Sequence, residues 1–365
     1  MFPASSSISS SEPPPDPTGW RRFLRIFAGT ALGLGLAAYL FIVTVDPWGM
    51  LPLSPSLPRA PISTNARFSM PMLATSPRFD AAIIGTSTSR LLRPAALDRL
   101  LGAHFVNLAM NSATPWEQGR MLALFARHHP DPKVVVIGLD SAWCLARADS
   151  PRLTGRPFPE WMYGDNRWRG YLHVANLYAL QEAANQFMML VGARRSHYGA
   201  DGYTDFLPAE NRYDAARVDR IFRQWGQPST DPAASRPTDP AALSILARLL
   251  PTLPSDTIKI LYMPPIADEE LGTPGSWIAA KWQSCRDGAT RIAQATPNTV
   301  LVDFAYRDPV TTTRSNFWDP VHYRVPIADR VMQAIAQAAT TGDAAPGDID
   351  RVLVSRSLVQ EGDRK

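Results

Sequence analysis

The chain is poor in the residues that build metal centres and disulfide scaffolds. Its 365 residues include two cysteines, Cys144 and Cys285, and six histidines. Two thiols are too few for a disulfide framework or a cysteine-ligated zinc site, and the spacing of the histidines is not typical of metal ligands. We therefore expect neither a metal nor a cofactor. Whether the two cysteines pair in an oxidising compartment stays open, because sequence does not show whether their Cα atoms approach.

The chain also lacks the patterns of nucleic-acid and nucleotide binding. A net charge of +4 and a pI near 9.2 could suggest a nucleic-acid partner. Lysine and arginine are scattered, however, and no basic stripe carries interleaved aromatics, so we expect no nucleic acid. The stretch from Gly85 to Arg90, GTSTSR, is not followed by Gly-Lys-Ser/Thr and therefore has no P-loop lysine.

One long apolar run is present near the N-terminus. From Ile26 to Val45 the chain carries no charge, which at the rise of an α-helix is enough to cross a hydrocarbon core. The run exceeds the ~7 to 15 apolar residues usual in a signal peptide, and no small-x-small cleavage pattern follows it before Asp46. We interpret it as an uncleaved, single-pass anchor in the inner (cytoplasmic) membrane, which makes the membrane itself a partner through residues 26–45.

The charges that flank this run predict its orientation. Arg21, Arg22 and Arg25 precede it, whereas Asp46 is the first charge after it. By the positive-inside tendency the N-terminus is cytoplasmic, and everything after Val45 is periplasmic or otherwise extracytoplasmic.

Composition divides the chain into five parts. The N-terminal part is rich in Ser and Pro with no apolar periodicity, which is typical of disorder, and the segment after the apolar run is rich in Pro, which is typical of an extended spacer. We predict a disordered cytoplasmic tail over 1–19, the anchor over 20–45, a spacer over 46–77, one large domain over 78–340 with an insertion at about 145–250, and a C-terminal tail over 341–365.

Short apolar runs alternate with amphipathic segments in the large domain, which predicts an α/β fold. This alternation favours a parallel sheet with helices on both faces, so we expect a three-layer α/β/α architecture with a five-stranded parallel sheet of flavodoxin-like type. The predicted strands are Ala81–Ile84, Phe105–Leu108, Val134–Ile137, Ile258–Met263 and Val300–Phe304. The predicted helices are Leu91–Leu101, Trp116–His128, Trp277–Ala295 and Ile327–Ala339.

Polar side chains follow the predicted strands at their carboxyl ends. Ligands of such sheets bind beyond these ends, so we expect the polar groups to share one rim. They are Ser87 after the first strand, Asn111 and Ser112 after the second, Asp140 after the third, and Asp319 with His322 after the fifth.

Three of these residues have the chemistry of nucleophilic catalysis. Ser87 stands in a Gly-x-Ser turn within FDAAIIGTSTSR, and Asp319 stands three residues before His322 in FWDPVHYR. A serine hydroxyl is a poor nucleophile near neutral pH, so it needs an imidazole to take its proton and a carboxylate to hold the imidazole tautomer. The pattern predicts Ser87 as nucleophile, His322 as base and Asp319 as orienter.

The insertion contains an aromatic-rich stretch, RPFPEWMYGDNRWRGYLHVANLY, from Arg156 to Tyr178. One interpretation is a cap over the site in which Trp161, Trp168 or Tyr171 stacks on sugar rings; the other is a satellite core, since buried aromatics usually only pack. Two further segments complete the prediction: a surface loop over Gly226–Pro240, and a C-terminal stretch, Val352–Val359, that either adds an edge element or stays mobile.

The blocks IIGTSTSR, VNLAMNSATPWE, VVVIGLD and FWDPVHYR, in this order, resemble the blocks of the SGNH (GDSL-type) hydrolase superfamily. They are most similar to its membrane-anchored extracytoplasmic branch, which includes alginate O-acetylation proteins and the D-alanyl transfer protein of teichoic acid synthesis. The resemblance covers about Asp80 to Ala339 without the insertion. It implies that Ser87 is the nucleophile, His322 the base and Asp319 the orienting acid.

The sequence departs from the family pattern in each of the first three blocks. Thr86 replaces the acid of Gly-Asp-Ser, Ser112 falls at or beside the family's oxyanion glycine, and Asp140 matches the family's asparagine only loosely. An ionised aspartate cannot donate a hydrogen bond. We therefore expect the oxyanion donors to be the N–H groups of Ser87 and Ser112 and the amide of Asn111, with Asp140 structural or in contact with a substrate hydroxyl.

The resemblance implies acyl chemistry, with acetyl as the expected group. The expected activity is that of a serine esterase or O-acyltransferase acting through an acyl-enzyme on a cell-envelope or exported polysaccharide, with a membrane-borne acyl-donor protein as a further partner. The alternative from another class is a catalytically inactive module that keeps the fold to bind polysaccharide or a membrane partner. Neither the acyl donor nor the choice between water and sugar as acceptor follows from the sequence.

Overall fold

The structure is a computed structural model that describes residues 17–144, 155–225, 240–344 and 349–356. Several predicted segments lie wholly or partly outside these residues. They are the disordered tail over its first 16 residues, the surface loop over 226–239, and the C-terminal tail over 345–348 and 357–365.

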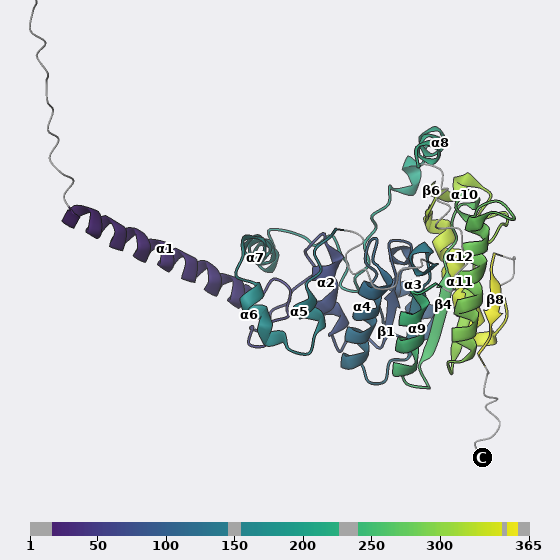
Figure 1. Cartoon of the computed structure of the whole chain (residues 1–365), viewed down its shortest axis with the longest axis horizontal. Coiled ribbons are helices and arrows are strands. Elements are labelled where there is room, and N and C mark those ends of the chain that lie inside the picture. Colours follow the sequence, from purple (N-terminus) through teal and green to yellow (C-terminus); the bar gives the residue numbers. More distant parts are fainter. Residues whose placement is uncertain (1–16, 145–154, 226–239, 345–348, 357–365) are drawn as a thin grey trace, which may run out of the picture.

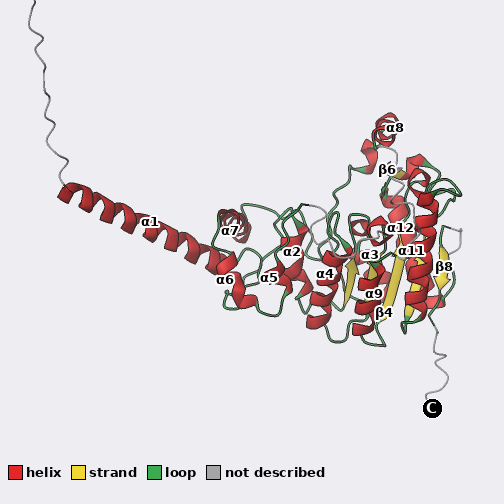
Figure 2. Ribbon diagram, in the orientation of Figure 1, coloured by secondary structure: helices red, strands yellow, loops and turns green. Residues whose placement is uncertain are grey.

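The core of the domain is a six-stranded, mostly parallel sheet (Figures 1 and 2). Its strands are β1 (Ala81–Ile84), β2 (Phe105–Asn107), β3 (Val134–Gly138), β4 (Ile258–Met263), β5 (Thr299–Asp303) and β8 (Arg351–Val354). Their order is β2-β1-β3-β4-β5-β8, in which the first five run parallel and β8 is antiparallel to β5. The predicted α/β class is confirmed. The predicted five-stranded, wholly parallel sheet is corrected by β8, which forms the C-terminal edge element.

Alternate side chains of each strand enter two different cores. On β1, Ala82 and Ile84 face one core while Ala81 and Ile83 face the other, and all four are fully buried. Burial on both faces explains why the strands are continuous apolar runs rather than alternating ones. Helices α3 (Pro94–Leu101) and α12 (Val325–Thr341) cover one face; α4 (Pro115–His128), α9 (Leu243–Leu249) and α11 (Trp277–Gln294) cover the other.

The remaining elements are short connections and parts of the insertion. The helices are α5 (Glu160–Tyr163), α6 (Gly170–His173), α7 (Leu177–Leu190), α8 (Ala215–Gln224) and α10 (Asp268–Leu271), and a hairpin is formed by β6 (Phe317–Asp319) and β7 (His322–Tyr323). The single 3-10 turns are η1 (Ser89–Leu91), η2 (Ser141–Cys144), η3 (Arg167–Arg169), η4 (Glu210–Arg212), η6 (Leu250–Thr252) and η7 (Arg314–Asn316).

Helix α1 (Pro17–Val45) projects from the domain (Figure 1). The span Thr18–Val45 contains an 18-residue window with a mean hydropathy of 2.1, so by length and composition the helix can cross a membrane, a test that a signal sequence near the N-terminus also passes. Its last residues belong to the domain, because Ile42 and Val45 are buried and the helix contacts α7.

The segment predicted as an extended spacer, 46–77, is instead part of the folded domain. Helix α2 (Ala66–Ala74) begins at Asn65, whose side chain caps the Arg67 N–H. Met50 and Met70 are completely buried in the core that contains α4. Proline content suggested an extended chain, but the apolar residues between the prolines bury enough surface to fix it against the domain.

Cys144 of η2 and Cys285 of α11 form a disulfide, with their Cα atoms 5.1 Å apart. The bond joins the end of the β3 region to a helix that is 141 residues away in sequence. Structural disulfides persist in oxidising compartments, so this bond points to an extracytoplasmic domain.

Candidate active site

The turn after β1 presents Ser87 at the carboxyl edge of the sheet. Ser89 packs between Gly85 and Gly138, and a Cβ on either glycine would overlap the Ser89 hydroxyl. That hydroxyl is 2.8 Å from the hydroxyl of Tyr262 on β4. Glycine is therefore needed where β1 and β3 end, because only a residue without a side chain lets the turn close over the sheet.

The β6–β7 hairpin holds the imidazole and the carboxylate in a fixed relation. The Oδ1 atom of Asp319 accepts hydrogen bonds from the backbone N–H groups of Val321 (3.0 Å) and His322 (2.9 Å). The second oxygen, Oδ2, lies 2.7 Å from Nδ1 of His322. Because a carboxylate only accepts, Nδ1 carries the proton and Nε2 is the free acceptor nitrogen.

The Ser87 hydroxyl lies 2.8 Å from Nε2 of His322. The two residues are 235 positions apart in sequence, and the His322 and Asp319 side chains are about one-fifth exposed, at 17% and 20%. Ser87, His322 and Asp319 thus form a continuous hydrogen-bonded relay at the rim. The distances are those required for a base to take the proton of a serine nucleophile.

The loop after β2 lies beside this relay, and hydrogen bonds from Arg67 hold its backbone in place. Ser112 has a positive φ of 51°, a conformation that costs a residue with a Cβ about 1–2 kcal/mol. The Arg67 guanidinium donates to the carbonyls of Asn111 (3.2 Å) and Ser112 (3.4 Å), and it also pairs with Glu117 at 2.7 and 2.5 Å. Met110 N–H donates to the Gly85 carbonyl at 3.0 Å, which ties this loop to the serine turn.

The backbone N–H groups of Ser87 and Ser112 are among those at the rim that have no acceptor within the described chain. They belong to the turn after β1 and the loop after β2, and parallel β1 and β2 end at the same edge. Free N–H groups beside a nucleophile are what an oxyanion hole requires. Their use as oxyanion donors stays a prediction.

Asn111 is oriented by a charged neighbour. Its Oδ1 atom accepts from Nη1 of Arg90. Because a guanidinium can only donate, the oxygen faces Arg90 and the amide Nδ2 is left on the other side as a donor. The described residues contain no acceptor for this Nδ2, so Asn111 keeps a donor for a ligand.

Arg90 itself is a functional candidate that sequence reasoning missed. Only 6% of it is exposed, and its guanidinium lies over the rings of Phe206 (4.9 Å) and Tyr198 (5.7 Å). Burial lowers the pKa of Arg90 from its ordinary value. Phe206 in turn meets the His322 ring edge-on at 5.7 Å. The only sequence signal was the position of Arg90 in the first block, because the aromatics come from the insertion.

Asp140 lies at the same end of the sheet but its oxygens are already engaged. Oδ2 accepts the Thr86 hydroxyl, and Oδ1 accepts the Ala142 N–H at 3.0 Å. Burial raises the pKa of Asp140 to about 6, against the opposing effect of these two hydrogen bonds. The contacts give Asp140 a structural part in joining the β1 and β3 turns, one of the two roles expected from sequence. Contact with a substrate hydroxyl stays a prediction.

The aromatic half of the insertion does not cover the relay. Helices α5 and α6 lie on the side of the domain next to α1, well separated from β6 (Figure 1). Trp161 belongs to α5, and Trp168 belongs to η3, which directly precedes α6. The later part of the insertion approaches the site instead, through Phe206 and through Glu210, which bonds Arg324 at 2.7 Å. The substrate-binding role predicted for Trp161 and Trp168 is therefore not at the Ser87 site. Either these residues bind a ligand on another surface or they bind none.

Among the described residues, no three His, Cys, Asp or Glu side chains gather as metal ligands would. Comparison of the chain with protein-family models, with curated proteins and with solved structures gives no match. The molecule is thus an α/β domain with a mostly parallel sheet, an N-terminal apolar helix and a Ser-His-Asp relay at the carboxyl edge of the sheet.

Proposed function

We propose that this chain is a membrane-anchored, extracytoplasmic serine esterase or O-acyltransferase of SGNH type that acts on a cell-envelope or exported polysaccharide. The observation that carries the proposal is the hydrogen-bonded order Ser87 Oγ, His322 Nε2, His322 Nδ1, Asp319 Oδ2, with separations of 2.8 and 2.7 Å. Such an arrangement is recognised by geometry and roles rather than by sequence position. The resemblance of the sequence blocks to SGNH proteins favours an acetyl group.

The first half-reaction forms an acyl-enzyme. The Ser87 oxygen attacks the carbonyl carbon of an acyl ester while Nε2 of His322 takes the hydroxyl proton. The imidazolium that forms is stabilised by the adjacent Asp319 carboxylate. His322 then returns the proton to the leaving oxygen, the ester C–O bond breaks, and the acyl group stays on Ser87.

The second half-reaction uses the same groups in reverse. His322 takes a proton from the acceptor hydroxyl, whose oxygen attacks the acyl carbon. The bond between the acyl carbon and the Ser87 oxygen then breaks, and His322 returns the proton to that oxygen. Water as acceptor gives a free acid, and a sugar hydroxyl gives a new ester. Transfer and hydrolysis therefore differ only in which acceptor reaches the acyl-enzyme.

The negative oxygen of each tetrahedral intermediate needs donors close to Ser87. The unpartnered N–H groups of Ser87 and Ser112 and the amide Nδ2 of Asn111 are the candidates. Losing one such donor typically lowers the rate about 100- to 1000-fold. The buried Arg67–Glu117 pair supports this role, because it fixes the backbone of the loop from which Ser112 donates.

The cellular setting of the proposal is supported by two features. Helix α1 is apolar over a length that can span a bilayer, and the Cys144–Cys285 disulfide favours an oxidising compartment. An anchor through residues 26–45, with the N-terminus cytoplasmic, would keep the catalytic domain near a membrane-borne acyl donor and near exported glycan.

A second candidate function is a catalytically inactive polysaccharide- or partner-binding module on the same fold. The observation that favours it is Asp140, which stands near the place of the family's donor asparagine and offers only acceptor oxygens once ionised.

Covalent labelling separates the two candidates. We expect the full-length protein in detergent micelles to react with a fluorescent serine-directed fluorophosphonate, and Ser87→Ala to abolish the reaction. His322→Gln should slow labelling strongly, because the serine then lacks its base. An unlabelled but folded wild-type protein would support the binding module and exclude the esterase.

Product analysis then distinguishes transfer from hydrolysis. The full chain is incubated with p-nitrophenyl acetate in the presence and absence of a defined oligosaccharide. An acetylated oligosaccharide seen by mass spectrometry identifies a transferase. Free acetate alone, at a rate that the oligosaccharide does not change, identifies an esterase.

A further inference from the structure

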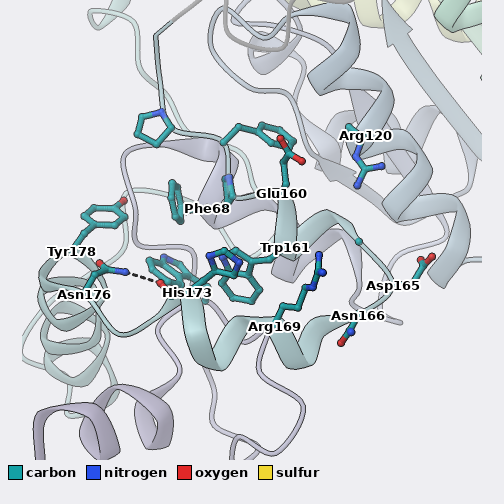
Figure 3. Close-up of a pocket in the computed structure, with 15 residues that line it drawn as sticks. Phe68, Arg120, Glu160, Trp161, Asp165, Asn166, Arg169, His173, Asn176 and Tyr178 are labelled. Carbon is teal, nitrogen blue, oxygen red and sulfur yellow. Dashed lines mark hydrogen bonds between the residues drawn. The ribbon is translucent and has the colours of Figure 1, made fainter. Parts of the chain in front are cut away.

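A cleft of about 810 Å³ lies beside the end of α1 and is lined by α5, α6 and the residues that follow α1 (Figure 3). Ser87, Asp319 and His322 are not among its lining residues. Its volume is within the range of about 300 to 1,000 Å³ usual for ligand pockets. The cleft is therefore separate from the Ser87–His322–Asp319 relay, and acyl chemistry at Ser87 does not use it.

Aromatic rings form one part of the lining. Trp161 is half-buried and lies parallel to the His173 ring at 6.2 Å, with an interplanar angle of 2°. Trp48 meets Trp161 edge-on at 6.4 Å and Phe68 at 5.1 Å. A side chain at Gly170 would collide with the Trp161 ring, so the glycine lets the indole pack against the start of α6. The rings are thus held in place before any ligand arrives.

Two buried donors of the lining have no partner within the described chain. They are the indole Nε1 of Trp48, a residue that is 3% exposed, and Nε of Arg120. An unsatisfied buried donor costs about 1–3 kcal/mol. Both residues line the cleft, so a ligand whose hydroxyl or ether oxygens reach these donors would remove this cost.

Charged side chains complete the lining, and their charges balance. Arg120 and Arg169 contribute two positive charges, and Glu160 and Asp165 contribute two negative charges. Asp165 is already paired with Arg127 at 3.0 Å. Such a lining does not favour a strongly charged ligand of either sign. Rigid aromatic faces beside carboxylate, amide and guanidinium groups suit a neutral ring that has an apolar C–H face and a rim of hydroxyls.

We propose that this cleft is a saccharide-binding site for a neutral stretch of oligosaccharide, in which Trp161 stacks on a sugar ring and Trp48 and Arg120 donate to its oxygens. Trp48 follows the end of α1 at Val45 by three residues. With α1 in a bilayer, the site lies at the membrane surface and holds glycan there. The site goes beyond the proposed acyl chemistry, since it needs neither Ser87 nor His322.

The test is a fluorescence titration of the full-length chain in detergent micelles with cellohexaose, chitohexaose and mannohexaose, because Trp48 and Trp161 report on the cleft directly. We expect a saturable change with at least one hexasaccharide and a loss of affinity of about tenfold in Trp161→Ala. Arg169→Ala, which removes an exposed side chain, should weaken binding without changing the thermal midpoint. Trp225→Ala, a surface tryptophan of 46% exposure outside the cleft, is the matched control.

Three outcomes overturn the proposal: no saturable change with any hexasaccharide, equal loss in Trp225→Ala and Trp161→Ala, or a response only to the soluble phospholipid dihexanoylphosphatidylglycerol. The last result would assign the cleft to lipid headgroups. The titration is repeated with Ser87→Ala, which should bind like the wild type. If the esterase proposal is wrong, fluorophosphonate labelling is absent while hexasaccharide binding is retained. The two proposals can therefore fail separately.

Discussion

Arg67 and Glu117 form an ion pair in which neither side chain is exposed to solvent. The pair joins α2 to the first turn of α4, where Glu117 also accepts the Thr114 N–H and completes a capping box. Arg67 uses its other N–H groups on the carbonyls of Asn111 and Ser112. One buried contact therefore links the segment after the apolar helix α1 to the loop beside the Ser87–His322 relay.

Breaking this pair should destabilise the domain strongly. Glu117→Gln or Arg67→Met leaves a buried charge without its partner, which typically costs about 3–5 kcal/mol. Chemical denaturation of the full-length protein measures the loss. The matched control is Asp329→Asn, because its pair with Arg93 is 39% exposed on each side and is worth at most about 1 kcal/mol. Similar losses in the control and in Glu117→Gln would contradict the argument.

Removing the orienting carboxylate should lower the acyl-transfer rate without unfolding the protein. In Asp319→Asn the amide cannot hold the Nδ1–H tautomer of His322, so we expect kcat to fall about 10⁴-fold. Initial rates with p-nitrophenyl acetate measure it. His128→Gln, at an exposed histidine on α4, should keep wild-type activity. Retention of full activity in Asp319→Asn would remove the carboxylate from the mechanism.

The positive φ of Ser112 gives a test of the oxyanion loop. Ser112→Gly should keep the loop conformation and the activity, whereas Ser112→Val should lose about 100-fold or more, because a β-branched residue disfavours φ near 51° and moves the N–H. Asn298 has nearly the same φ, 52°, but precedes β5 at the opposite end of the sheet. Asn298→Val should therefore lower stability while leaving the rate unchanged. If Asn298→Val also lowered the rate, backbone strain alone would explain the rate loss in Ser112→Val.

Asp140 should make stability depend on pH between about 4 and 6. Burial raises its folded-state pKa to about 6 from 3.8, so in this range the folded state holds more protons than the unfolded state. Stability then falls as pH rises from about 4 to 6, by at most about 3 kcal/mol, and levels off above that. Urea denaturation at several pH values measures the slope. Asp140→Asn should flatten it, and an unchanged slope would exclude Asp140 as its source.

The disulfide should contribute to stability but not to chemistry. Replacing Cys144 and Cys285 by alanine opens a loop with a sequence separation of 141 residues, and we expect a loss of about 2–4 kcal/mol. Denaturation in the presence and absence of reductant measures it, and the reductant should leave the double variant unchanged. If a folded double variant no longer reacted with the fluorophosphonate at Ser87, the disulfide would be needed for chemistry as well as for stability.

Sequence patterns identified most of the sheet because its strands are buried on both faces. Five apolar runs, each within a residue of its strand, became β1 to β5, and the Pro and Gly residues near their ends marked the helices between them. The sixth strand was left open, because Arg351–Val354 is short, half-exposed and charged at one end. Edge strands of this kind carry a weak apolar signal.

The segment 46–77 was predicted incorrectly in its conformation because proline content dominated its composition. Its apolar residues, among them Met50 and Met70, are buried only when α2 meets α4. Composition does not show such long-range packing. The same holds for Arg90, whose aromatic neighbours Tyr198 and Phe206 come from an insertion with no periodic pattern.

By itself the sequence determined the α/β class, the apolar N-terminal helix and the identity of the polar groups that follow each strand. These features follow from the spacing of apolar residues along the chain and from the direction of each strand, which are local properties. Tertiary structure alone decided that Ser87 and His322 stand 2.8 Å apart, that Cys144 reaches Cys285, and that Trp161 lines a separate cleft. Each of these joins segments that are distant in the chain or on different surfaces. Such proximity depends on how helices and strands pack, and a local stretch of sequence does not show this packing.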